Sequence, residues 1–286
     1  MTSPASLESA TVARLREIRH VALDMDGTIY RGGTLFPFTN PFLAQLTALG
    51  IGYSFLTNNS SKSTADYVKH LDKIGISATT EQVYTSTQAS IEFLRECMPA
   101  VRRLFVLGTT SMITEVELAG FEATTDTPTD EPDAVLVGFD TGLTYARLCR
   151  AAYWIKQGKP FLASHPDYVC PTDEPTVLVD CGAICAALRE AAGRAPDAVL
   201  GKPDPRMLHG LSRRLSLAPE NLAMVGDRLY TDIEMARRAG ALGVLVLTGE
   251  ATLADVARHP SPVDLVAADL EELGCLLAEA QDTSAT

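Results

Sequence analysis

Short apolar runs alternate with amphipathic stretches along most of this chain. The runs are typical of strands buried in a parallel sheet; they are HVALDMD, GYSFLTNN, RRLFVLG, DAVLVGFD, KPFLASH, LAMVGD and LGVLVLTG. The stretches between them space apolar residues as helices do, and several end at glycine, a common helix stop; examples are TADYVKHLDKIG, TYARLCRAAYWIKQG, CGAICAALREAAG and TDIEMARRAG. This alternation predicts right-handed βαβ units and therefore an α/β fold with a doubly wound parallel sheet.

The composition is that of a globular protein, with 46% hydrophobic and 21% charged residues. A formal net charge of −12 argues against general nucleic-acid binding, which usually needs a basic face. It also provides no long-range attraction for an anionic substrate, so a phosphate site has to be built locally from a metal, a lysine and backbone N–H groups. The first 20 residues lack the apolar segment of a signal peptide, and no apolar run reaches transmembrane length, so we expect a cytoplasmic protein without a membrane partner.

The six cysteines include no CxxC pair. No histidine or further cysteine lies at zinc-site spacing from them, so we interpret them as small buried thiols. Cys181 and Cys185 are four residues apart, as neighbours on one helix face would be.

Polar side chains follow four of the predicted strands, and the carboxyl ends of parallel strands are where such sheets bind ligands. These side chains are Asp24 and Asp26 in DMDGT, Thr57 and Asn58 in LTNNS, Lys202 in GKPDP, and Asp227 and Asp232 in VGDRLYTD. Asp24 and Asp26 are two residues apart, so they face the same side if the strand geometry continues.

Each segment has an ordinary structural explanation when it is taken alone. A DxD pair is more often a turn, TNNS suits a helix cap, Asp232 suits an N-cap, and a lysine before proline is usually solvated. Taken together, the segments supply four acids, a lysine and a hydroxyl–amide pair. Magnesium-assisted phosphoryl transfer through an aspartyl-phosphate requires this set of groups.

The order of the four segments resembles the haloacid dehalogenase (HAD) superfamily of phosphohydrolases. DMDGT is similar to the first family motif, TNN to the second, GKP to the third and GDRLYTD to the fourth. The similarity extends from about residue 20 to residue 250. It implies a Rossmann-like catalytic core that acts on phosphomonoesters.

The resemblance also implies a role for each matching residue. Asp24 would be the nucleophile and a Mg²⁺ ligand. Asp26 would act as general acid and base, with its backbone carbonyl on the metal. Thr57 and Asn58 would hold the phosphoryl group, and Lys202 would neutralise Asp24 and that group. Asp227 would bind the metal directly, and Asp232 would hold a metal-bound water or orient Lys202. Mg²⁺ suits these oxygen ligands.

The spacing between the segments predicts an inserted domain. About thirty residues separate Asp24 from Thr57, whereas about 140 separate Asn58 from Lys202, far more than one crossover needs. We therefore expect a core of residues 1–87 and 194–286 and an α/β cap of residues 88–193, with the polar stretch 123–133 as a loop inside the cap. Such an insertion is similar to HAD class IIA: the p-nitrophenylphosphatases, phosphoglycolate phosphatases and NagD-like nucleotide or sugar phosphatases.

The segment ASHPDYVCPTDEPTVLVDCGAICAAL resembles the substrate-facing part of the cap in this branch. Its candidates for substrate contact are His165, Asp167 and Gly182, the last because glycine lets backbone N–H groups approach a substrate. For His165 a structural role remains an alternative, because relatives tend to have Thr-Asn-Pro-Asp where this chain has Ser-His-Pro-Asp. We assign Tyr153 and Trp154 to the core or surface of the cap.

The leading hypothesis is a Mg²⁺-dependent phosphatase acting on a small phosphorylated metabolite: a sugar phosphate, phosphoglycolate, glycerol phosphate or a nucleoside monophosphate. One alternative is a phosphotransferase or mutase, in which another acceptor replaces water. A second alternative is a binding protein that senses a phosphorylated metabolite without turnover. Members of this branch often pair through their caps, so a homodimer of that kind is one expected arrangement.

Overall fold

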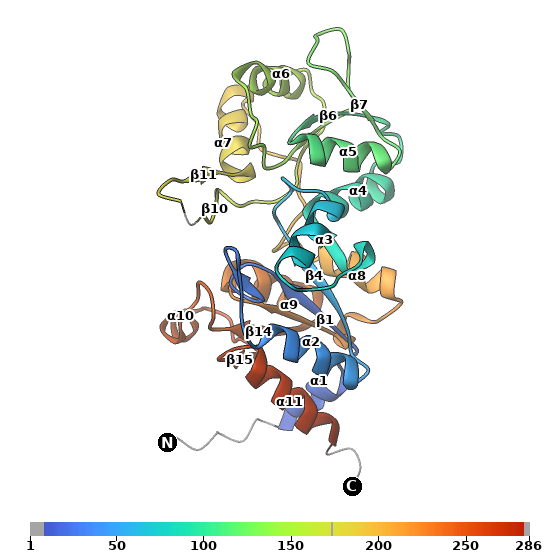
Figure 1. Cartoon of the computed structure of the whole chain (residues 1–286). Helices are drawn as coiled ribbons and strands as arrows, with labels where there is room; N and C mark the ends of the chain where they lie inside the picture. Colours follow the sequence, from blue (N-terminus) through green and yellow to red (C-terminus); the bar gives the residue numbers. More distant parts are fainter. Residues whose placement is uncertain (1–8, 173, 283–286) are drawn as a thin grey trace. The chain divides into compact units, whose positions relative to one another are not determined.

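The computed structural model describes residues 9–172 and 174–282, which form two compact units (Figure 1). The first unit contains the described residues up to 56, residues 74–76 and the described residues from 211 onward. The second contains Thr57–Lys73 and Ser77–Gly210. We describe each unit by itself.

The main sheet of the first unit is parallel wherever its pairing is defined, with the strand order β15-β14-β13-β1-β4-β5. Its strands are β1 (His20–Asp24), β4 (Gly52–Thr57), β13 (Leu222–Gly226), β14 (Leu242–Val246), β15 (Leu265–Ala267) and β5 (Val83–Thr85). The division of the chain counts β5 and Thr57, the last residue of β4, with the second unit. The central position of β1 follows from its sequence, because Val21, Ala22 and Leu23 are fully buried and suit a strand covered on both faces.

Helices and short strands complete the first unit. They are α1 (Ser9–Glu17), β2 (Tyr30–Arg31), β3 (Thr34–Leu35), α2 (Thr39–Ala48), η2 (Pro219–Asn221), η3 (Leu229–Ile233), α9 (Glu234–Ala239), α10 (Leu253–Arg258) and α11 (Leu270–Asp282), with α8 (Arg206–Leu215) crossing the boundary of the units. Helix α11 packs against both α1 and α2.

The second unit has a parallel five-stranded sheet in the order β12-β9-β8-β6-β7. Its strands are β6 (Arg103–Leu107), β7 (Glu122–Ala123), β8 (Ala134–Val137), β9 (Phe161–Ala163) and β12 (Ala198–Val199), and a small antiparallel pair joins β10 (Val169–Cys170) to β11 (Leu178–Val179). The helices are α3 (Thr64–Lys73), η1 (Thr80–Gln82), α4 (Ser86–Cys97), α5 (Thr110–Leu118), α6 (Tyr145–Lys156) and α7 (Cys181–Ala192).

Local sequence explains the ends of α7. Asp180 is its N-cap and accepts a hydrogen bond from the Cys181 amide (2.6 Å). Gly193 ends it in the left-handed conformation, with φ of 77°. On the buried face, the sulfur atoms of Cys181 and Cys185 are 4.0 Å apart, which confirms that they are neighbours on one helix face.

The α/β fold with parallel sheets is confirmed, and Trp154 is buried in the second unit while Tyr153 is 41% exposed. Two predictions need correction. TDIEMARRAG is not one α-helix, because Leu229–Ile233 is a π-helical segment and α9 begins only at Glu234. The cysteines are not uniformly buried, because Cys97, Cys149 and Cys275 lie on exposed faces of their helices. Among the described helices, none is long and apolar enough to cross a membrane.

Candidate active site

Three carboxylates come together in the first unit. Asp24 is the last residue of β1, Asp227 directly follows β13, and Asp232 lies in the π-helical segment that comes next. Because β1 and β13 are adjacent and parallel, their carboxyl ends meet at one edge of the sheet. One carboxylate oxygen from each residue lies within 4.8 Å of the other two. Asp26, in the turn after β1, is half-buried and is not one of the three.

Glycines allow the backbone to approach these acids closely. Gly27 has a φ of +85°, and a Cβ there would lie 2.5 Å from a carboxylate oxygen of Asp227. A Cβ at Gly249 would also overlap Asp227, and one at Gly226 would overlap Asp232. The Glu250 amide donates to the Asp227 Oδ2 atom at 2.7 Å, which fixes the orientation of that carboxylate.

Arg228, between Asp227 and Asp232, was not singled out from the sequence. Its amide donates to Asp232 at 3.2 Å, and its guanidinium lies 2.9 Å from Glu250. Burial alone would lower the pKa of Arg228, but Tyr230 and the carboxylates of Asp24, Asp227 and Glu250 raise that pKa above its ordinary value. Its position inside the GDRLYTD segment could have identified Arg228 as a site residue from the sequence.

The three acids fit a divalent metal. Like charges this close repel each other, and a bound cation relieves that repulsion. All three offer hard carboxylate oxygens, the ligand type that Mg²⁺ prefers. The first unit therefore has a donor set suited to Mg²⁺ in Asp24, Asp227 and Asp232.

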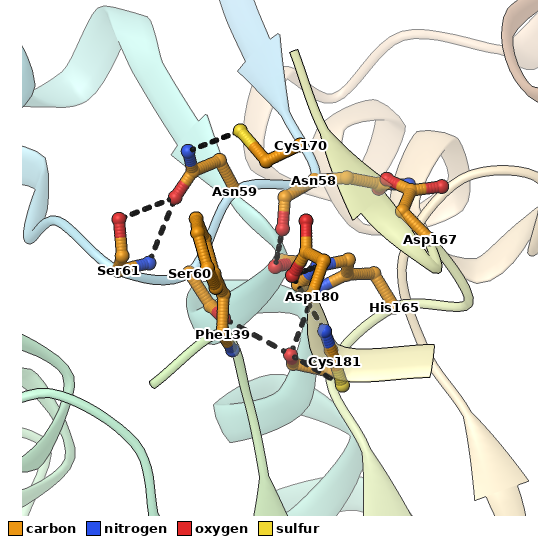
Figure 2. Close-up of polar contacts among 12 residues, drawn as sticks. Asn58, Asn59, Ser60, Ser61, Phe139, His165, Asp167, Cys170, Asp180 and Cys181 are labelled. Carbon is orange, nitrogen blue, oxygen red and sulfur yellow. Dashed lines mark hydrogen bonds and ion pairs between the residues drawn. The ribbon is translucent and has the colours of Figure 1, made fainter. Parts of the chain in front are cut away.

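A second group of predicted residues lies in the other unit (Figure 2). Thr57 ends β4, and its hydroxyl accepts the Asn59 amide at 3.1 Å. The side chain of Asn58 accepts the Lys202 amide at 2.7 Å and donates to the Lys202 carbonyl at 2.9 Å. Its Nδ2 atom also donates to Asp167 at 3.0 Å. The Asn58 side chain thus joins the TNN segment to the GKP segment, which lies 144 residues further along the chain.

The cap candidates form a buried polar cluster. His165 has no exposed surface; its Nε2 atom is 2.8 Å from Asp180 Oδ1 and its Nδ1 atom is 2.9 Å from the Ser164 hydroxyl. Burial alone would lower the pKa of His165, but the Cys181 thiol and two aspartates raise it to about 9. The imidazole is therefore charged at neutral pH.

Asp167 is half-buried, and Gly182 packs against its segment. The Gly182 amide donates to the Asp167 carbonyl at 2.8 Å. A Cβ at Gly182 would overlap the Pro166 carbonyl oxygen. In this structure the glycine allows two backbone segments to pack closely, and its contact with substrate stays a prediction.

Comparisons with known proteins identify the family of the chain. The family model of haloacid dehalogenase-like hydrolases matches residues 21–122, and a HAD-hydrolase-like model matches residues 199–273. An acid sugar phosphatase of Staphylococcus aureus is 30% identical over 90% of this chain and 97% of its own length.

Two solved structures are similar over nearly the whole chain. The 4-nitrophenylphosphatase of Thermotoga maritima is 38% identical, with a TM-score of 0.86 over 92% of this chain and 98% of that one. A glycerol phosphate phosphatase of Mycobacterium tuberculosis in complex with magnesium is 31% identical, with a TM-score of 0.82 over 91% of this chain and 78% of that one. The chain therefore belongs to the haloacid dehalogenase-like hydrolase family, among its phosphatases.

Proposed function

We propose that this protein is a Mg²⁺-dependent phosphatase that hydrolyses small phosphomonoesters through an aspartyl-phosphate intermediate. The observation that carries the proposal is the group of three carboxylates formed by Asp24, Asp227 and Asp232. A cluster of this kind suits a metal that neutralises both the nucleophile and the phosphoryl oxygens.

The first half of the reaction forms the intermediate. An oxygen of Asp24 attacks phosphorus, and the bond from phosphorus to the ester oxygen breaks. Asp26 donates a proton to that leaving oxygen as general acid. When bound, the metal would be held by Asp24, Asp227 and the backbone carbonyl of Asp26, with Asp232 holding its water, and it would supply electrostatic stabilisation of the transferring group.

The second half releases phosphate. Asp26, now ionised, removes a proton from a water molecule, which attacks phosphorus and returns the Asp24 carboxylate. Lys202, the Thr57 hydroxyl and the backbone N–H of Asn58 hold the phosphoryl oxygens through both steps. We assign the main chain of Asn58 to this role because its side chain already bonds to Lys202 and Asp167.

The substrate class follows from the relatives, whose names give sugar phosphates, 4-nitrophenyl phosphate and glycerol phosphate. We propose a small phosphorylated metabolite of this kind, selected by a cap of residues 88–193. A homodimer through the cap and a cytoplasmic location are separate proposals, to be tested by light scattering and by cell fractionation.

The test is hydrolysis of p-nitrophenyl phosphate, followed by a panel of phosphorylated metabolites, each with and without Mg²⁺. We expect Mg²⁺-dependent release of inorganic phosphate in an amount equal to the alcohol formed. Transfer of the phosphoryl group to added sugars without phosphate release would identify a transferase and contradict the proposal. Stabilisation by a phosphorylated ligand with no turnover of any ester would indicate a sensor.

A further inference from the structure

The Asn58 side chain lies at the junction of two hydrogen-bonded segments of the second unit. Its carbonyl oxygen accepts the Lys202 amide, and its Nδ2 atom donates both to the Lys202 carbonyl and to the Asp167 carboxylate. Its orientation is therefore determined by Lys202 on one side and by Asp167 on the other. Figure 2 shows Asp167 beside Asn58. The position of Asp167 consequently affects the loop that carries Thr57 and Asn58.

The backbone on either side of Asp167 is held against the start of α7. Gly182 donates its amide to the Asp167 carbonyl at 2.8 Å, and the Asp180 amide donates to the Tyr168 carbonyl at 3.0 Å. The Pro166 carbonyl leaves no room for a Cβ at Gly182. These contacts hold residues 166–168 against the first turn of a twelve-residue helix.

His165 makes a second set of contacts between the same elements. It bonds to Asp180, the N-cap of α7, and to Ser164. The Ser164 hydroxyl is in turn 3.2 Å from that of Ser60, two residues after Asn58, and Ser60 accepts the Phe139 amide at 2.8 Å (Figure 2). His165 is thus connected to the loop after β4 as well as to α7.

Gly201 brings the two sets of contacts together. A Cβ at this position would lie 2.5 Å from the Asn58 Oδ1 atom and 2.7 Å from the His165 Cβ atom. Only a glycine lets Asn58 and His165 pack on the backbone immediately before Lys202. A change in the position of either side chain therefore acts on the Gly201–Lys202 peptide.

His165 lies between Ser164 and Asp180, as the histidine of a Ser-His-Asp hydrolytic triad does. Burial excludes that function here. Ser164 and His165 have no exposed surface, so no substrate reaches the hydroxyl. The charge of the cluster is partly compensated: one imidazolium lies beside two carboxylates, with ligand atoms of His165, Asp167 and Asp180 all within 4.8 Å. A buried, hydrogen-bonded network of this kind stabilises one geometry.

We propose that Asp167 and the His165–Asp180 pair are positioning residues of the phosphatase reaction: they hold the Asn58 side chain, and through it the Lys202 backbone, in the geometry that binds the phosphoryl group. This inference rests on the proposed function. The phosphoryl-binding residues that Asp167, His165 and Asp180 would position are Thr57, Asn58 and Lys202.

The first experiment compares Asp167→Ala with Glu174→Ala, which removes an exposed acid from the same segment. We expect Asp167→Ala to lower kcat by about 10- to 100-fold, the size expected for a small displacement of binding groups. The loss should be similar for p-nitrophenyl phosphate and for every other ester, and the affinity for inorganic phosphate, measured by calorimetry with Mg²⁺, should fall by a comparable factor. Glu174→Ala should stay within twofold of the wild type.

Asp167→Asn provides a rescue test, because its amide oxygen still accepts from Asn58, and it should recover most of the activity. If Asp167→Ala instead changes KM for some esters only and leaves phosphate affinity intact, Asp167 contacts the organic part of the substrate and the inference is wrong. Full activity of Asp167→Ala would also contradict it. A wild-type protein inactive on all esters would refute the proposed function instead.

A double-mutant cycle tests whether His165 acts through the same contacts as Asp167. His165→Gln should lower kcat in the wild type but add little to the loss in Asp167→Ala, because both changes act on the same contact. Additive losses would contradict the link between the two residues. If His165→Gln does not fold, the Asp167 variants and their phosphate affinities still decide the proposal.

Discussion

Each unit of the molecule has a cluster of charged side chains beyond the carboxyl ends of parallel strands, and the two clusters are balanced differently. In the first unit, Asp24, Asp227 and Asp232 lie together, and the neighbouring Arg228 is 2.9 Å from another acid, Glu250. In the second unit, two aspartates surround the buried His165, which supplies a positive charge from the chain itself.

The difference supports the proposed placement of the chemistry in the first cluster. Three adjacent carboxylates offer the oxygen ligands that a divalent cation prefers, and a metal bound there can also take part in a reaction. The second cluster places an imidazolium beside its carboxylates, and burial keeps His165 away from substrate. The first cluster therefore suits catalysis, whereas the second suits positioning.

The largest effect should come from Asp24→Asn, which removes the proposed nucleophile. We expect turnover of p-nitrophenyl phosphate to fall by about 10⁴-fold or more, with the thermal midpoint of unfolding little changed. Asp72→Asn, at an exposed position of α3, is the matched control and should keep full activity. Residual activity above a hundredth of the wild type would contradict the assignment of Asp24.

Metal binding should separate the two clusters. Mg²⁺ at about 100 times its Kd should stabilise the wild type by about 2.7 kcal/mol, and EDTA should reverse this. Asp227→Asn should lose the stabilisation, while Asp180→Asn in the second cluster should keep it. Calorimetric unfolding with and without Mg²⁺ measures both, and a loss of the Mg²⁺ effect in Asp180→Asn alone would mean that the clusters have been assigned the wrong way round.

Two buried histidines should give opposite pH dependences. Protein surroundings raise the pKa of His165 from 6.5 to about 9, so its contribution to stability is present below pH 6.5 and is lost as the pH rises through 9. Burial lowers the pKa of His20 from 6.5 to about 4, so its contribution is present above pH 6.5 and is lost as the pH falls through 4. Each of these shifts in pKa corresponds to about 3 kcal/mol.

The check is the unfolding midpoint measured from pH 4 to 9. His165→Gln should remove the fall of the unfolding midpoint at alkaline pH and leave its fall at acid pH unchanged. His20→Gln should remove the fall at acid pH and leave the fall at alkaline pH unchanged. The same pH profile in both variants would show that neither histidine is the titrating group.

The smallest effect should come from Gly182→Ala. Its Cβ would overlap the Pro166 carbonyl, so either α7 or residues 166–168 must shift, at a cost of about 1–3 kcal/mol. Gly33→Ala is the control, since nothing lies within 4 Å of a Cβ there. Equal unfolding free energies for both variants would show that the loop and the helix are not tightly packed.

The sequence was most informative where long apolar runs form strands. The strands β1, β4, β6, β8, β9, β13 and β14 were all predicted, and the chemical groups at their ends could be recognised because ligands bind at that edge. Two-residue strands such as β7, β10 and β12 were missed, because two residues show no alternation.

The second cluster could not be predicted for a different reason. His165 and Asp180 are separated by the β10–β11 pair, and no local pattern records that this pair brings them to 2.8 Å. The orientation of the Asn58 side chain likewise depends on Lys202, 144 residues away. Residue types and strand ends were visible in the sequence, but partners brought together by tertiary structure were not.

The interleaved chain path has a consequence for synthesis on the ribosome. Strand β1 pairs with β13, which is translated about 200 residues later. At roughly 5–20 residues per second, β1 waits for tens of seconds before its partner leaves the exit tunnel. Most of the second unit is one continuous stretch that emerges in the meantime. That continuous stretch is therefore available to fold before β1 can pair with β13, and the sheet edge that carries Asp24 and Asp227 is completed only afterwards.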